Sequence, residues 1–195
     1  MAAPLRLAIK GNHTDAVHLL LSRGSYIPTD KDLRDALILN NIDMVSILLD
    51  YTVSCKNSHS LRLLMENGPF DMFRKLLHIY TPNDLVSYNV LHHGAFWGNP
   101  KHIEDILACG VNINNKNNTT FRSFDIYTAD STPLHVAVCR ARIDNVKYLL
   151  QRGVDHTIKD HYGLTPLNLA IKATNQWKRR ELYLPIVELL STLDG

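Results

Sequence analysis

The chain has few of the features that carry secretion, membrane insertion or disulfide chemistry. It contains three cysteines in 195 residues, Cys55, Cys109 and Cys139, which are widely spaced and form no CxxC pair. The first residues, Met1 to Arg6, lack the charged start and apolar run of a signal peptide. No stretch approaches about 18 consecutive apolar residues, so we expect no membrane insertion. These absences predict reduced thiols in a protein of the cytoplasm, the nucleus or both.

Catalytic motifs and a strong charge are missing as well. With 21 basic and 19 acidic residues the formal net charge is only +2, which makes nucleic acid an unlikely main partner. The basic run Lys178-Arg179-Arg180 is followed by Glu181, and we interpret it as a solvated helix face. The chain shows no nucleophile elbow, P-loop, dinucleotide-binding turn or kinase signature, and no HExxH or zinc-finger spacing. We therefore expect no enzyme, no metal site and no cofactor.

What the chain does contain is a repeated block. Thr132-Pro133-Leu134-His135-Val136-Ala137 returns 33 residues later as Thr165-Pro166-Leu167-Asn168-Leu169-Ala170. A weaker form of this pattern recurs through the rest of the chain. It begins with a leucine, called the motif Leu, and a small residue usually follows three positions later. An apolar residue stands about twelve positions after the motif Leu and is followed by a pair of leucine-like residues. The last copy carries an insertion, after which Val187, Leu189 and Leu190 are expected to be its core residues. Successive motif leucines are 28, 28, 30, 43 and 33 residues apart, at Leu5, Leu33, Leu61, Leu91, Leu134 and Leu167.

Each half of the pattern predicts a short helix. Its apolar residues stand at i, i+3 and i+4, which indicates one buried face. Between the halves lie glycine, asparagine and proline, which end helices, as in Gly11-Asn12, Asn67-Gly68-Pro69 and Gly98-Asn99-Pro100. Each copy is therefore a helix–turn–helix repeat. One repeat cannot bury its own apolar face, so stability must come from stacking.

On these residues the chain resembles the ankyrin-repeat family, whose units have about 33 residues and begin Thr-Pro-Leu-His-x-Ala. The match is nearly complete from Thr132 to Lys159 and from Tyr162 to Ala170, and good from Leu91 to Asn114. The resemblance implies an all-α solenoid of stacked helix–turn–helix units with short β-turn fingers. We expect one domain, 1–195, with an insertion loop at 115–130 and six repeats at approximately 1–28, 29–56, 57–84, 85–114, 127–159 and 160–195.

The resemblance also implies where a partner would bind. In this family the finger tips and exposed positions of each first helix, on the concave face, contact partners. Five and six residues after the motif Leu this chain carries Ile38-Leu39 in the second repeat and Phe96-Trp97 in the fourth. Arg140 takes the second of these positions in the fifth repeat. Exposed aromatic side chains often contribute about 2 kcal/mol each to an interface. The alternatives are that the insertion covers Phe96 and Trp97, and that the short repeats bury Ile38 and Leu39.

The insertion loop supplies the remaining candidate contacts. It begins polar and then becomes aromatic, which a purely solvated loop would not need. A loop beyond the usual length is commonly functional or mobile. We predict that Arg122, Phe124, Asp125 and Tyr127 contact the partner.

Three functional hypotheses follow. The first is a non-catalytic intracellular module that binds another protein through its concave helix face and insertion loop. The second is a structural role, including an adaptor for a ubiquitin ligase, which needs a recruitment box that is not visible before Gly195. The third is a viral or bacterial effector directed at a host. We also expect an exposed apolar outer face on the final helix, including Leu182, Leu189 and Leu193.

Overall fold

The chain consists of short helices joined by tight turns. The computed structural model describes residues 4–51, 58–117, 122–123, 126–127, 129–176 and 180–193. The chain divides into two compact units, Met1–Thr81 and Pro82–Gly195, called the N-terminal and the C-terminal unit. Regular structure in the described ranges is helical except for one pair of two-residue strands, which confirms the predicted all-α class. In those same ranges no helix has the length and apolarity needed to cross a lipid bilayer.

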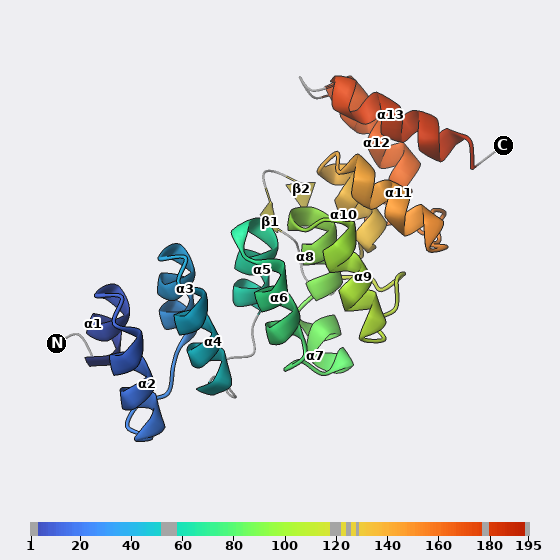
Figure 1. Cartoon of the computed structure of the whole chain (residues 1–195). Coiled ribbons are helices and arrows are strands. Elements are labelled where there is room, and N and C mark those ends of the chain that lie inside the picture. The colour runs from blue at the N-terminus through green and yellow to red at the C-terminus, as the bar shows by residue number, and fades with distance from the viewer. Residues whose placement is uncertain are drawn as a thin grey trace. The chain divides into compact units, whose positions relative to one another are not determined.

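The described part of the N-terminal unit is a stack of helix pairs (Figure 1). The first helix of each pair is α1 (Pro4–Lys10), α3 (Asp30–Ile38) or α5 (Ser58–Asn67). The second is α2 (Thr14–Ser22), α4 (Ile42–Tyr51) or α6 (Phe70–Leu77). Helix α3 contacts α1 and α5, and α4 contacts α2 and α6, so first and second helices form two layers. The motif leucines Leu5, Leu33 and Leu61 are buried in this stack.

Local interactions explain why these repeats fold without the Thr-Pro block. The chain turns back after α1 and α3 at Asn12 and Asn40, whose φ angles are 58° and 52°. Asparagine adopts this left-handed conformation more readily than most residues. At the start of α3, the backbone N–H and the hydroxyl of Thr29 both donate to Asp32 Oδ2, at 2.9 and 2.6 Å. This carboxylate contact fixes the first turn of the helix, as in a capping box.

The C-terminal unit continues the same architecture. Its helix pairs are α8 (Val90–Trp97) with α9 (Pro100–Ala108), α10 (Pro133–Cys139) with α11 (Ile143–Gln151), and α12 (Pro166–Gln176) with α13 (Arg180–Ser191). Helix α10 packs between α8 and α12, and α11 packs against α9 and α13. A short helix that the sequence did not predict, α7 (Pro82–Ser87), packs on α8. Its one buried residue, Leu85, gives too little periodicity for a helix to be recognised from the sequence.

The small residue three positions after the motif Leu has a steric reason. At Gly94 an added Cβ would lie 2.9 Å from Ile106 Cδ1, so α8 and α9 approach more closely than a methyl group allows. Ala36 and Ala137 take the equivalent positions in two other repeats, and both are fully buried. Close packing of the two helices therefore accounts for glycine or alanine in these repeats, whereas the third repeat accommodates the buried Leu64 at this position.

The described residues of the insertion include backbone pairing at two places. At its base the Asn117 N–H donates to Ser131 O at 3.0 Å, and the Ser131 N–H donates to Asn117 Oδ1 at 2.7 Å. Further out, β1 (Arg122–Ser123) pairs antiparallel with β2 (Ile126–Tyr127). The sequence predicted an insertion loop at 115–130 but not the pairing within it, because two strands of two residues each leave little pattern in a sequence.

The last repeat differs from the predicted register. The residues of α13 that are buried are Tyr183, Ile186 and Leu190, whereas Val187, which was expected to be the core residue, is half-buried. The insertion before α13 removes the fixed spacing on which that assignment relied. On the other side of this helix Leu182 is exposed and Leu189 is half-buried, and Leu193, two residues past the helix end, is exposed; the expected exposure therefore holds for Leu182 and Leu193.

Candidate functional site

Two predicted contact residues of the N-terminal unit are exposed to solvent. Ile38, the last residue of α3, is 74% exposed, and Leu39, which caps the helix, is 40% exposed. The short 28-residue repeats therefore do not bury them. Single exposed apolar residues are common on protein surfaces and by themselves indicate little. The surroundings of Ile38 decide whether it belongs to a binding surface.

A hollow of about 140 Å³ lies between the first helices α3 and α5, and Ile38 forms part of its wall. Its lining includes three residues of α3 and three from α5 and the turn after it: Arg34, Leu37, Ile38, Leu63, Gly68 and Pro69. Leu37 and Leu63 are half-buried. Ile38 is therefore the exposed edge of an apolar depression, not an isolated side chain. Sequence reasoning missed Arg34, Leu37 and Leu63, because only positions five and six after the motif Leu were considered.

In the C-terminal unit the structure brings three other predicted residues together. The Cζ atom of Arg140, at the end of α10, lies 4.3 Å from the ring centroid of Phe96 and 5.5 Å from that of Trp97. The two rings are 4.5 Å apart. A guanidinium group over an aromatic face is attracted by the ring quadrupole. This group of Phe96, Trp97 and Arg140 is called the aromatic–arginine cluster below.

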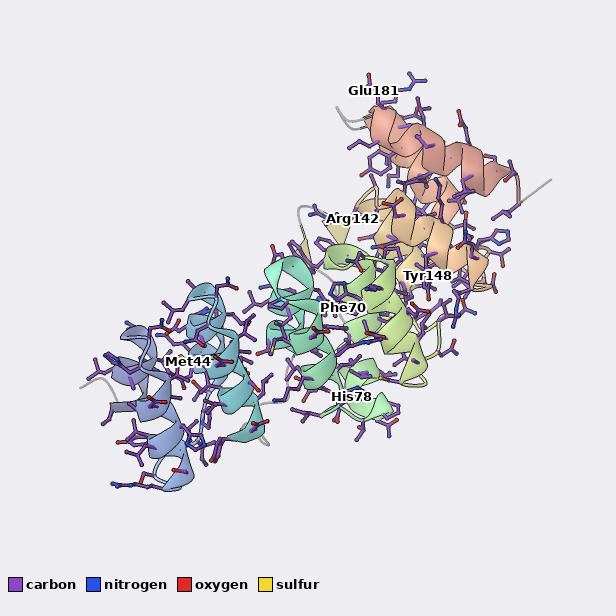
Figure 2. The ribbon with its side chains drawn as sticks, viewed as in Figure 1. Met44, Phe70, His78, Arg142, Tyr148 and Glu181 are labelled. Atoms are coloured by element: carbon purple, nitrogen blue, oxygen red, sulfur yellow. The ribbon has the colours of Figure 1, made fainter. Side chains whose placement is uncertain are left out.

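Phe96 cannot make the contact that the sequence suggested for it. It is only 2% exposed, because Arg140 lies over its ring and α8 packs against α10. Arg142, labelled in Figure 2, also reaches this site, since its Nε–H donates to Phe96 O at 3.3 Å. Trp97 and Arg140 are half-buried and form the accessible part of the cluster. Phe96 is a supporting residue, and the side chain over its ring is Arg140 of the next repeat, whereas the alternative interpretation assigned this role to the insertion.

The predicted residues of the insertion are less well placed. Arg122 in β1 and Tyr127 in β2 stand directly opposite each other in the ladder. Only their backbone is described. Phe124 and Asp125 lie outside the described residues. These four positions remain sequence-based predictions.

Buried histidines tie successive repeats together. His92 Nε2 lies 2.9 Å from Ser131 O, and His135 Nε2 lies 3.0 Å from Leu164 O. Because a carbonyl oxygen only accepts, each Nε2 must carry a proton. His135 Nδ1 then accepts from the Thr132 N–H at 3.2 Å.

The electrostatics of these histidines fit the same structural role. Burial lowers the pKa of His92 from the ordinary 6.5 to about 4, although backbone groups of Ser131 and Asn115 oppose the shift. Burial lowers the pKa of His135 too. Both rings are therefore neutral donors at pH 7. In the described part of the chain no three His, Cys, Asp or Glu side chains come together as metal ligands would.

The repeated helix pairs have a counterpart among known protein families. Residues 91–192, which are 102 of the 195 residues, match the family model for ankyrin repeats in three copies. The chain belongs to the ankyrin-repeat family. The fold and the resemblance inferred from the sequence are confirmed.

Similar sequences occur in two proteins of a virus and in a human channel. A Fowlpox virus (strain NVSL) protein named "Putative ankyrin repeat protein" is 32% identical over 178 residues, 88% of this chain and 44% of the viral protein. A second protein of that virus with the same description is 25% identical over 168 residues, 82% of this chain and 38% of its own length. Human transient receptor potential cation channel subfamily A member 1 is 27% identical over 173 residues, 87% of this chain and 13% of the channel. The chain thus spans less than half the length of these relatives.

Proposed function

We propose that this ankyrin-repeat chain is a non-catalytic module of the cytoplasm or nucleus that binds another protein through its first-helix surface. Ankyrin repeats are a general protein-interaction module, which supports the coarse assignment. The more specific assignment, to the first-helix surface, is supported by the exposure of Ile38 beside an apolar hollow between α3 and α5. Burying a fully exposed isoleucine side chain contributes about 1.5 to 3 kcal/mol. An anchor of this size is typical of the central residue of an interface.

The aromatic–arginine cluster is the proposed second contact. Trp97 and Arg140 are residue types enriched at the centres of interfaces, and both remain partly accessible. We also propose, on sequence grounds, that Arg122, Phe124, Asp125 and Tyr127 of the insertion contact the partner. The hypotheses of a ubiquitin-ligase adaptor and of a host-directed effector need the same binding step and differ only in what the captured protein undergoes.

The proposal is tested with a partner identified by proximity labelling and then purified. The double variant Ile38→Ser, Leu39→Ser is expected to bind it about tenfold to a hundredfold more weakly, the effect of removing about 1.4 to 2.8 kcal/mol of contact energy. Leu19→Ser is the matched control, because Leu19 is 51% exposed but lies on the second helix α2. Equal affinity of the double variant and the wild type, with unchanged circular dichroism, would refute the assignment.

A further inference from the structure

The hollow between α3 and α5 contains a cation without a counterion. Arg34 lines the hollow and is half-buried, yet it makes no hydrogen bond or ion pair with any residue in the described ranges. Glu66, at the end of α5, is exposed and is not part of the lining. The other lining side chains are the apolar Leu37, Ile38, Leu63 and Pro69 and the neutral amide of Asn40, so Arg34 is the one charged residue of the lining. A half-buried guanidinium group beside apolar walls carries a positive charge that a carboxylate would complement.

The repeat register explains why Arg34 lacks a partner. Arg6 and Arg34 both stand directly after a motif Leu, in the position that His135 takes in the fifth repeat. Arg6 Nε lies 3.8 Å from Asp32 Oδ1, which precedes the motif Leu of the following repeat. The residue that precedes the next motif Leu is Ser60, which is neutral. The arginine of the first repeat thus lies within ion-pair distance of a carboxylate, whereas the arginine of the second has no carboxylate at that distance among the described residues.

The size of the hollow limits what can occupy it. Pockets for small organic ligands usually measure about 300 to 1,000 Å³, whereas this one has about 140 Å³. That volume suits one large side chain, and a single large side chain often serves as the anchor of a protein interface. Because the walls are apolar and the single cation stands among them, the anchor must be an apolar side chain next to an acidic one.

We infer that the hollow between α3 and α5 binds a segment of a partner protein in which an aspartate or glutamate stands beside a large apolar residue. The apolar side chain fills the space between Leu37 and Leu63 and packs on Ile38, while the carboxylate pairs with Arg34. The inference rests on the proposed function and specifies the chemistry of the partner. Bidentate pairing between a guanidinium and a carboxylate is stronger in a partly desolvated site than on an open surface.

The test begins with a random peptide library displayed on phage and selected against the immobilised full chain. Enriched peptides are expected to carry Asp or Glu within two positions of Leu, Ile, Met or Phe. The best one is synthesised with a fluorophore, together with a version in which its acidic residue is changed to the neutral amide. Binding of both peptides is measured by fluorescence polarisation to wild type, Arg34→Gln and Arg23→Gln. Arg23 is the matched control, an exposed arginine that caps α2 and does not line the hollow.

The expected result is a double-mutant cycle with coupling between Arg34 and the acidic residue. In wild type and in Arg23→Gln, amidation of the peptide weakens binding about tenfold or more. In Arg34→Gln both peptides bind with similar, weak affinity. If the Gln variant unfolds, judged by circular dichroism, Arg34→Lys replaces it, and the cycle then shows a reduced but measurable coupling.

Several outcomes would overturn the inference: no enriched peptide, enriched peptides without an acidic residue, or equal loss on amidation in wild type and Arg34→Gln. Self-association that Arg34→Gln abolishes, measured by analytical ultracentrifugation, would assign the hollow to a second copy of the chain instead. The proposed function is tested separately with its purified partner. If Ile38→Ser no longer binds that partner but Arg34→Gln still does, the inference of an acidic segment is refuted and the proposed function stands. If both variants still bind it, the proposed function is refuted as well.

Discussion

Acid is expected to destabilise the C-terminal unit because His92 is buried as a neutral ring. Its pKa is about 4 in the folded chain and about 6.5 when unfolded. Below pH 6.5 the unfolded state therefore binds more protons, and the free energy of unfolding falls as the pH falls. The loss from this one group is about 2 kcal/mol at pH 5 and approaches about 3 kcal/mol near pH 4, while above pH 7 the group contributes no pH dependence.

The assay is urea unfolding of the full chain, followed by tryptophan fluorescence. Both tryptophans, Trp97 and Trp177, belong to residues 82–195, so the signal reports on the C-terminal unit. His135 and the acidic residues also titrate, and the comparison must therefore be with His92→Asn. That substitution is the one that the chain itself carries at Asn168, the equivalent position of the last repeat. Between pH 7.5 and pH 5 the wild type should lose about 2 kcal/mol more than the variant.

The reasoning would be refuted by parallel pH dependence of the two proteins. In that case His92 would be protonated in the folded state or accessible to solvent, in contradiction to its complete burial. A constant offset between the proteins at all pH values is expected in addition, because the variant also changes that hydrogen bond. Only the difference in slope tests the buried neutral ring.

Three further predictions concern contacts of the C-terminal unit. Asn145→Ala removes two hydrogen bonds that the Asn145 amide donates, to Ala95 O at 3.0 Å and to Gly98 O at 3.3 Å. The variant should lower the unfolding free energy by about 2 to 3 kcal/mol in the same urea assay. A change under about 0.5 kcal/mol would contradict this prediction. Asn117→Ala opens the base of the insertion, so the Ser131 amide should lose protection in hydrogen exchange. Arg140→Ala uncovers the cluster and should shift tryptophan emission to the red, whereas Arg152→Ala should not.

Periodicity was sufficient to locate the helix pairs, because it follows from burial within each repeat. Five of the six motif leucines, Leu5, Leu33, Leu61, Leu91 and Leu134, are buried, whereas Leu167 is half-buried. The glycine at position 94 is needed for the contact of α8 with α9, so a local packing rule was enough to predict it. Where an insertion broke the spacing, as before α13, the prediction of Val187 as a core residue failed.

The candidate site was less predictable, since it depends on contacts between repeats. Phe96 is covered by Arg140, a residue 44 positions later, and no pattern within one repeat can show this. Exposure of Ile38 followed from its place in the helix, but the hollow beside it requires Leu63 and Pro69 of the next repeat. The unpaired Arg34 did leave a signal in the sequence, because Asp32 and Ser60 differ at equivalent positions. It becomes informative only when the contact of Arg6 with Asp32 is known.

Site-specific photo-crosslinking tests most directly whether the surface between α3 and α5 binds another protein. A photoreactive benzoylphenylalanine replaces Ile38 in one protein and Leu19 in another, and both are irradiated in cells and analysed by mass spectrometry. The account predicts a defined covalent adduct with one partner protein from position 38 and none from position 19. Adducts from position 19 alone, or from neither position, would contradict it.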